Sequence, residues 1–345
     1  MKYNKILIVR LSAIGDVINT IPALAALRQN FPKSFIGWVV EDKAGDLLAG
    51  LPILDKVFVW RRRGNRKITK SFGLIQELRQ HKFDIAIDFQ GNLKSGLITS
   101  LSGAQTKVGM KPAKEGNALF TNYKVALPAQ KMNRVERNLY ILKQLGINTD
   151  GLDWQKIPAL FSPADESYID KFLAENNPSK KTIIILHPGT SEFGLFKRWA
   201  PGKYVHLADR LAKELKARCI ISWAGKEKPL AESIAQQMSH KPLIFPEQLS
   251  LNKLAALIKR SQLFIGSDSA PLHLANLLGV NVIGLYGPKD PAIYAPYQFA
   301  QAGNKNAIVR KDLPCSPCQK RSCAKPICME SITVEEVFQK VKQML

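Results

Sequence analysis

Short apolar runs alternate with segments of helical periodicity along the chain. In the first half, four runs have the composition of strands buried on both faces, at 5–10, 35–40, 57–60 and 84–88. Apolar residues recur at helical spacing between and after them, over 16–30, 42–50, 69–80 and 92–101. Uninterrupted apolar strands that alternate with helices indicate a parallel, doubly wound sheet.

The same alternation restarts after the segment 154–180, which contains Pro158, Pro163 and Pro178. Strands are expected at 182–186, 218–223, 262–265 and 281–285, and helices at 203–216, 228–238, 250–260 and 270–278. Proline removes a backbone donor and fixes φ, so this segment is a natural boundary, although 165–176 could carry one helix. We predict an α/β protein of two Rossmann-like domains, residues 1–163 and 164–345, that face each other across a cleft. A last helix at about 333–344 is a candidate to pack back on the N-terminal domain.

Charge points to an anionic partner. The 345 residues include 50 Lys and Arg against 28 Asp and Glu, a formal net charge of +22. Such an excess is typical of proteins that meet nucleic acid, an anionic membrane surface or a phosphorylated substrate. Seven basic residues and no acidic one lie between positions 56 and 70: Lys56, Arg61, Arg62, Arg63, Arg66, Lys67 and Lys70. This basic run is either a solvated face or a contact for anionic lipid head groups.

Several broad classes are disfavoured. The sequence has no RNP-like, zinc-finger or helix-turn-helix motif, so we predict that nucleic acid is not the partner. No uncharged apolar run approaches the ~18 residues of a spanning helix, and the first apolar run is too short for a signal peptide. These observations favour a cytoplasmic protein.

Ligands of doubly wound sheets bind beyond the carboxyl ends of the strands, so the loops there are the candidate sites. In the first, Gly15 permits a tight turn and Asp16 falls at a helix start. Asp16 could cap that helix, or it could accept a proton from a substrate hydroxyl. The second runs from His187 to Ser191 and on to Lys197-Arg198-Trp199. Its hydroxyls and cations suit a diphosphate, although a solvated basic loop has the same composition.

The third loop ends the run Phe264-Ile-Gly-Ser-Asp-Ser269 and opens a helix near Ala270. Ser269 and the free N–H groups of that helix could bind phosphate. Asp268 and His273 could hold the rest of a nucleotide, while His273 is also compatible with a packed core position. The chain contains no Walker lysine motif, no Gly-x-Gly-x-x-Gly and no Asp-x-Asp. We therefore expect chemistry without a metal or cofactor.

Four of the five cysteines form a cluster, Cys315-x2-Cys318-x4-Cys323-x4-Cys328. Clustered thiols suggest a structural zinc ion, but the spacing is not that of two Cys-x-x-Cys pairs. Free or redox-active thiols are the alternative. We assign them no catalytic role and no metal.

Four segments taken together resemble glycosyltransferase family 9, the ADP-heptose:lipopolysaccharide heptosyltransferases. They are LSAIGDVINTIPAL at 11–24, DFQGNLKSG at 88–96, HPGTSEFGLFKRW at 187–199 and SDSAPLHLANLLGVNVIGLYGPKDP at 267–291. DFQGNLKSG and Lys114-Glu115 look more like heptosyltransferase I than heptosyltransferase II. The resemblance implies a GT-B architecture, an inverting mechanism, a nucleotide-sugar donor in the C-terminal half and a lipid-linked acceptor on the N-terminal half.

The resemblance also implies roles for individual residues. Asp16 matches the proposed catalytic base, and Lys197 is the second candidate catalytic residue. The implied donor-binding residues are Thr190, Ser191, Lys197, Asp268, Ser269, Ala270 and His273, with Glu227 as a shifted candidate for an expected acidic residue. The implied acceptor-binding residues are Lys94 and Lys114, joined by Arg61, Arg62 and Arg63 of the basic run. Lys114 replaces an expected arginine, which keeps the charge but loses the bidentate geometry.

The implied function is transfer of heptose from ADP-heptose to the Kdo region of a lipid A precursor. The enzyme would then be a peripheral protein on the cytoplasmic face of the inner membrane. A family member with another acceptor, such as an already heptosylated core, is one alternative. A non-catalytic module that binds a nucleotide sugar or a lipid is another.

Overall fold

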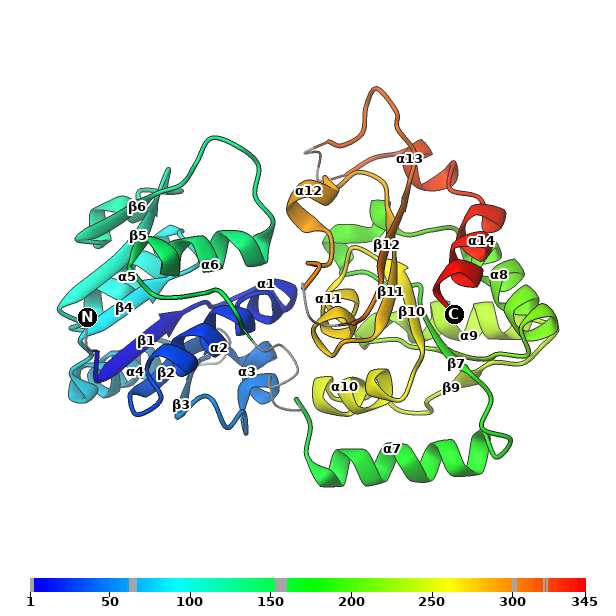
Figure 1. The fold of residues 1–345 in the computed structure, drawn as a ribbon, viewed down its shortest axis with the longest axis horizontal. Helices are drawn as coiled ribbons and strands as arrows, with labels where there is room; N and C mark the ends of the chain where they lie inside the picture. The colour runs from blue at the N-terminus through cyan, green and yellow to red at the C-terminus, as the bar shows by residue number, and fades with distance from the viewer. Residues whose placement is uncertain (1–2, 62–66, 153–159, 300–302, 319, 321) are drawn as a thin grey trace. The chain divides into compact units, whose positions relative to one another are not determined.

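The computed structural model describes residues 3–345 apart from 62–66, 153–159, 300–302, 319 and 321. The chain divides into two compact units, Met1–Leu160 and Phe161–Leu345. Each unit is a six-stranded parallel sheet packed between helices, a Rossmann-like arrangement (Figure 1). None of the helices in the described part of the chain combines the length and the apolar character needed to cross a bilayer.

The first unit has the strand order β3-β2-β1-β4-β5-β6, and every neighbouring pair is parallel. Its strands are β1 (Lys5–Val9), β2 (Phe35–Glu41), β3 (Lys56–Trp60), β4 (Ile85–Asp88), β5 (Thr106–Lys111) and β6 (Tyr123–Ala126). Its helices are α1 (Ile14–Ile18), α2 (Ile21–Asn30), α3 (Asp42–Leu48), α4 (Lys67–His81), α5 (Leu93–Leu101), the short 3-10 helix η1 (Asn117–Phe120) and α6 (Arg134–Gln144).

The second unit repeats this plan with the order β12-β11-β10-β7-β8-β9, again with parallel neighbours. Its strands are β7 (Ile183–His187), β8 (Arg218–Ile221), β9 (Leu243–Ile244), β10 (Leu263–Ser267), β11 (Asn281–Tyr286) and β12 (Asn306–Arg310). Its helices are α7 (Pro163–Asn176), η3 (Glu192–Lys197), α8 (Pro201–Glu214), η4 (Gly225–Glu227), α9 (Lys228–Gln237), α10 (Leu251–Lys259), α11 (Ala270–Leu277), α12 (Pro291–Tyr294), α13 (Ile327–Glu330) and α14 (Val334–Met344).

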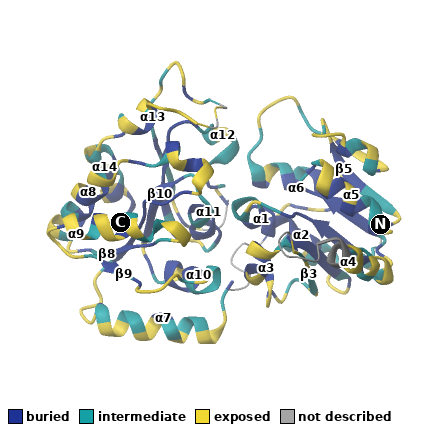
Figure 2. Cartoon of the chain, turned by 180° about the vertical axis from the view of Figure 1, so that it is seen from behind, coloured by how far each residue is buried: buried dark blue, intermediate teal, exposed yellow. Residues whose placement is uncertain are grey.

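The apolar runs form the centres of the two sheets. Residues Ile6 to Val9 of β1 and Leu263 to Ile265 of β10 are completely buried, because helices cover both faces of these strands. Figure 2 shows the same division, with buried strands and with exposed positions on the outer sides of the helices. In each unit, the loops that follow the central strands therefore leave from a rigid base.

The last helix belongs to the core of the second unit. The buried residues Val337, Phe338 and Val341 of α14 join a cluster that includes Trp199 and Tyr204, and α14 packs on α8, β11 and β12. This packing differs from the expectation that the helix would return to the N-terminal domain. The apolar residues of α14 are buried within the second unit itself.

The predicted helix 16–30 is two helices. α1 ends at Ile18, and α2 starts at Ile21 with Thr20 as its N-cap residue and Pro22 in its first turn. Proline is tolerated in a first turn, where its missing N–H would have no helical partner, but not in a helix interior. The break follows from Pro22.

Candidate active site

In the first unit, a buried arginine holds Asp16. Arg10 follows β1 and is 3% exposed. Its Nη2 lies 2.7 Å from Asp16 Oδ2, and its Nη1 donates a hydrogen bond of 2.6 Å to the Phe89 carbonyl oxygen. Arg134 Nε lies 3.9 Å from the other Asp16 oxygen. Burial lowers the pKa of Arg10, and the Asp16 charge opposes that shift.

Asp16 is a residue of the short helix α1 itself. The N-cap residue of α1 is Ala13, and Asp16 lies in the first turn. The Asp16 side chain is 31% exposed, so the carboxylate is anchored by guanidinium groups and still reaches solvent. A carboxylate in this state can accept a proton from a bound hydroxyl.

Asp88 organises the loop after β4. It is fully buried, and its Oδ1 accepts hydrogen bonds from the N–H groups of Gln90 at 2.8 Å and Gly91 at 3.0 Å. Its Oδ2 accepts from Ser95 Oγ and Asn117 Nδ2, each at 2.7 Å. Burial raises the pKa of Asp88, and the four hydrogen bonds oppose that shift. Through them Asp88 fixes the start of α5 and the position of η1.

The predicted acceptor lysines lie on this scaffold. Lys94 is exposed on α5, with its Nζ 5.9 Å from the centre of the Trp60 ring. Lys114 is exposed, and its backbone N–H donates to the Gly91 carbonyl oxygen at 3.2 Å. Arg61 follows β3 and is exposed, whereas Arg62 and Arg63 lie outside the described residues.

In the second unit, the predicted donor residues of two loops meet. Lys197 Nζ lies 2.7 Å from Asp268 Oδ2, and His273 Nε2 lies 3.6 Å from Asp268 Oδ1. Burial alone would raise the pKa of Asp268, but the His273 ring and the Lys197 ammonium outweigh it and hold the pKa at about 2. The Asp268 carboxylate therefore lies between the Lys197 ammonium and the His273 ring and contacts both.

The start of α11 presents polar atoms without a partner. Within the described residues, Ser269 Oγ and His273 Nδ1 are shielded from solvent and make no hydrogen bond. Ser269 is the N-cap residue but makes no side-chain cap bond, and Ala270 is the first residue of the helix. Buried polar atoms are normally satisfied, and a helix start attracts anions. This arrangement fits a phosphate group.

The loop after β7 is braced from within. Thr190 is buried, and its hydroxyl donates to the Gly194 carbonyl oxygen at 2.9 Å. Arg198 donates to the Thr190 hydroxyl at 3.2 Å and to the Thr190 carbonyl oxygen at 3.0 Å. Thr190 therefore shapes the loop, whereas Ser191 is exposed and available to a ligand.

Glu227 lies against the same loop. Its side chain is 12% exposed and accepts the Ala224 N–H at 2.9 Å. A Cβ atom added at Gly189 would come within 2.2 Å of the Glu227 carboxylate, so only glycine allows this approach. Burial raises the pKa of Glu227, opposed by the Ala224 hydrogen bond and the Arg198 charge. The structure thus brings the shifted acidic candidate next to the predicted phosphate loop.

Sequence reasoning assigned no role to two charged residues of these sites, Arg10 and Asp88. Each is a charged residue at or just beyond the end of a buried strand or in the loop that follows it. A charged residue at that position indicates a specific contact, because a buried charge requires an oppositely charged or hydrogen-bonding partner. Which partner it finds depends on the strand order.

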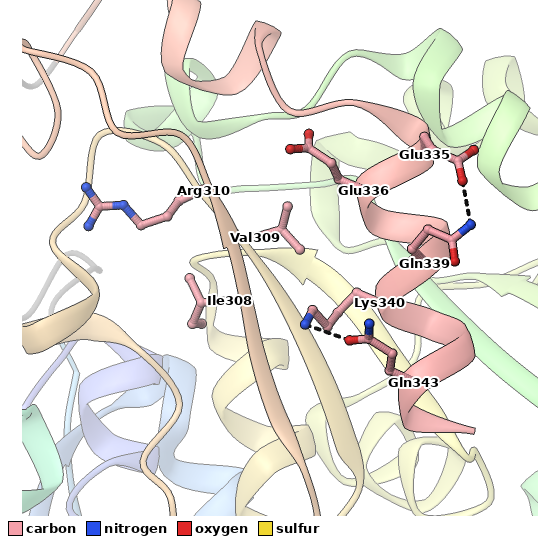
Figure 3. Close-up of a pocket in the computed structure, with 8 residues that line it drawn as sticks. All are labelled: Ile308, Val309, Arg310, Glu335, Glu336, Gln339, Lys340 and Gln343. Atoms are coloured by element: carbon pink, nitrogen blue, oxygen red, sulfur yellow. Dashed lines mark hydrogen bonds between the residues drawn. The ribbon is translucent and has the colours of Figure 1, made fainter.

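Other features lie apart from these groups. A cavity of about 420 Å³ is bounded by the edge strand β12 and by α14 (Figure 3), and its lining contains no predicted site residue. The five cysteines are free thiols: Cys219 and Cys328 are buried, Cys318 is half-buried, and Cys315 and Cys323 are exposed. Among the described residues, no group of three or more His, Cys, Asp or Glu side chains is arranged to hold a metal ion.

Comparisons with known proteins agree on one family. The model of glycosyltransferase family 9 (heptosyltransferase) matches residues 71–328. Lipopolysaccharide heptosyltransferase 1 of Pseudomonas aeruginosa is 26% identical over 99% of this chain and 98% of its own length. Lipopolysaccharide heptosyltransferase 3 of Escherichia coli is 25% identical over 82% of this chain and 83% of its own length.

A solved family 9 glycosyltransferase from Veillonella parvula has a TM-score of 0.83 at 23% identity, covering 99% of this chain and 97% of its own. The two parallel six-stranded sheets and this likeness establish the GT-B fold. The family match spans more than half of the sequence. The chain belongs to glycosyltransferase family 9, the heptosyltransferases, and is an enzyme of the glycosyltransferase class.

Proposed function

We propose that this enzyme transfers heptose from ADP-heptose to the Kdo region of a lipid A precursor, with inversion at the anomeric carbon. The observation that carries the proposal is the group at the start of α11. There the Lys197 ammonium pairs with Asp268, and two buried polar atoms of the residues that follow, Ser269 Oγ and His273 Nδ1, have no partner within the described residues. A nucleoside diphosphate supplies the anionic oxygens that this group lacks.

The donor residues stabilise the leaving group. As the bond between the anomeric carbon and the diphosphate oxygen breaks, its electron pair and one negative charge stay on ADP. The Lys197 ammonium and the first N–H groups of α11 are fixed before the reaction, so they stabilise that charge without rearranging. In this proposal they supply the positive charge, and the transfer needs no metal ion. Asp268 holds Lys197 in place through the 2.7 Å ion pair.

Asp16 takes the proton of the acceptor. The acceptor hydroxyl oxygen forms the new bond to the anomeric carbon from the face opposite the diphosphate, and its proton passes to the Asp16 carboxylate. Arg10 and Arg134 orient that carboxylate. Lys94, Lys114 and the basic run that begins with Lys56 and Arg61 would bind the anionic groups of the acceptor.

A different acceptor is the second candidate. The relative named heptosyltransferase 3 is nearly as similar as the relative named heptosyltransferase 1, which favours neither acceptor strongly. An already heptosylated core would use the same donor residues and the same base. Either acceptor is held in a membrane, so we place the enzyme as a peripheral protein on the cytoplasmic face of the inner membrane.

Incubation of the purified protein with a panel of nucleotide sugars and acceptors tests the proposal. We expect ADP-heptose to add one heptose to a Kdo–lipid A acceptor, detected by mass, and UDP-sugars to give no product. Product with only the heptosylated acceptor would favour the second candidate. Binding of ADP without turnover on any acceptor would identify a binding module instead.

A further inference from the structure

Three leucines of the first unit face solvent on two adjacent elements. Leu93 and Leu97 of α5 are 47% and 45% exposed, and Leu119 of η1 is 86% exposed. We call these three residues the leucine face. Scattered exposed leucines are ordinary, but a group on neighbouring elements indicates a contact surface.

The leucine face is rigidly built. α5 and η1 pack so closely that a Cβ atom at Gly96 would lie 2.6 Å from Asn117 Nδ2 and 3.1 Å from the Phe120 ring. The buried Asp88 carboxylate joins Ser95 of α5 to Asn117 of η1. Gly96 lies between Leu93 and Leu97 in the sequence of α5, so both leucines are next to the place where η1 docks. Their exposure is therefore a property of the folded unit.

The segment that carries the leucine face is rich in positive charge. Between positions 93 and 124 the sequence has five lysines and a single acidic residue, Glu115. Four of the lysines are exposed: Lys94, Lys111, Lys114 and Lys124. The Glu115 carboxylate accepts the Leu93 N–H at 3.3 Å, at the start of α5, so its charge is directed toward the helix. Exposed leucines and exposed lysines on the same segment are complementary to an anionic bilayer, which offers acyl chains below a negative surface.

We propose that the leucine face docks on an anionic lipid bilayer, with Leu119 and the exposed parts of Leu93 and Leu97 entering the interface and the lysines contacting lipid phosphates. The inference deepens the proposed function, because it rests on the acceptor being held in a membrane. The segment that carries the leucines also carries Lys94 and Lys114, so docking here would bring the predicted acceptor-binding lysines to the bilayer surface.

Binding of the full chain to vesicles tests the proposal. We expect the wild type to bind vesicles of phosphatidylglycerol and phosphatidylethanolamine, and to bind pure phosphatidylcholine vesicles much more weakly. The triple variant Leu93→Gln, Leu97→Gln, Leu119→Ser should bind the anionic vesicles about 30-fold less tightly, because each leucine withdrawn from an apolar contact costs a several-fold change. Ile327→Gln is the matched control. Ile327 is 46% exposed in the second unit, and its replacement should leave vesicle affinity unchanged.

A charge variant keeps the test independent of the leucines. Lys111→Glu with Lys124→Glu changes two exposed lysines outside the predicted acceptor set, and it should weaken vesicle binding strongly at low salt and only slightly at high salt. Circular dichroism and the Tm establish that each variant is folded. Unchanged vesicle binding in the folded triple variant would overturn the proposal. So would a wild-type dimer that the triple variant converts to a monomer while vesicle binding persists, because the face would then join two copies of this chain.

The transfer assay separates this inference from the proposed function. With a short soluble acceptor, the triple variant should keep the wild-type rate, whereas with lipid acceptor in vesicles its rate should fall in step with vesicle affinity. Absence of transfer in the wild type with both acceptors would contradict the proposed function and leave the vesicle result as the test of the surface. Equal losses with the soluble and the lipid acceptor would contradict docking and place the leucines in the acceptor site.

Discussion

The Arg10 guanidinium lies 2.7 Å from the Asp16 carboxylate and, through its other terminal nitrogen, donates to the carbonyl oxygen of Phe89. One buried side chain thus joins the predicted base to the loop after β4. The pairing of β1 with β4 makes this contact possible, because it places the carboxyl ends of the two strands side by side. The position of Asp16 therefore depends on Arg10.

Replacement of Arg10 by methionine should destabilise the protein by about 1.5–3 kcal/mol, because the buried Phe89 carbonyl oxygen loses a charged donor and the partly exposed Asp16 carboxylate loses its ion-pair partner. Urea unfolding measures this loss. Arg210→Met is the control, since Arg210 pairs with the exposed carboxylates of Glu214 and Glu335, and such pairs contribute about 1 kcal/mol or less. Equal losses in the two variants would contradict a structural role for the Arg10 contact.

His187 should make stability depend on pH. It is buried, its Nδ1 lies 3.0 Å from Ser222 Oγ, and burial lowers the pKa of His187 from 6.5 to about 4. The unfolded chain takes up a proton on this histidine as the pH falls below 6.5, and the folded chain does so only near 4. Stability from this group is thus complete above pH 6.5 and falls by roughly 3 kcal/mol toward pH 4.

Unfolding free energies measured between pH 4 and 7 check this dependence. His187→Gln should flatten the slope over that window, whereas His206→Gln, at an exposed position of α8, should leave it as in the wild type. A wild-type slope that persists in His187→Gln would assign the pH dependence to another group.

Lys197→Met should weaken ADP binding by about ten- to a hundredfold, since one charge-assisted contact contributes roughly 1.5–3 kcal/mol. It also leaves the buried Asp268 carboxylate without its lysine, so a repulsion opposes the diphosphate. Calorimetric titration with ADP measures the change, with Lys213→Met, on the exposed side of α8, as the control. If ADP affinity were the same in both variants, the diphosphate would bind elsewhere.

Much of the fold can be predicted from the apolar pattern. The central strands are recognisable because both of their faces are buried, so their runs contain few polar residues. β5 and β6 lie at the end of the first sheet and contain lysines at positions 107, 111 and 124. The apolar pattern does not predict these two strands. An outer strand has less apolar burial to mark it. The partly exposed strand β12, at the edge of the second sheet, is missed for the same reason.

The sequence indicates which loops form the site, but not which side chains within them are in contact. Residues after buried strands mark the loops that contain Asp16, Lys197 and Asp268. The ion pair between Lys197 and Asp268, 71 positions apart, arises because β7 and β10 are neighbours in the sheet. Strand order is a property of the whole unit, and no local pattern encodes it. For this reason the contact of Arg10 with Phe89, 79 positions away, and that of Asp88 with Asn117, 29 positions away, could not be assigned from the sequence.

Turnover of Asp16→Asn is the most direct test of the proposed chemistry. The amide keeps the shape of the carboxylate but cannot take the acceptor proton, so kcat should fall by about 10²–10⁴-fold. Affinity for ADP should not change, because the donor residues are untouched. Asp42→Asn is the matched control, at an exposed acidic residue in the first turn of α3, and it should retain wild-type kcat. Folded Asp16→Asn protein that kept more than about a third of the wild-type kcat would contradict the assignment of Asp16 as the base.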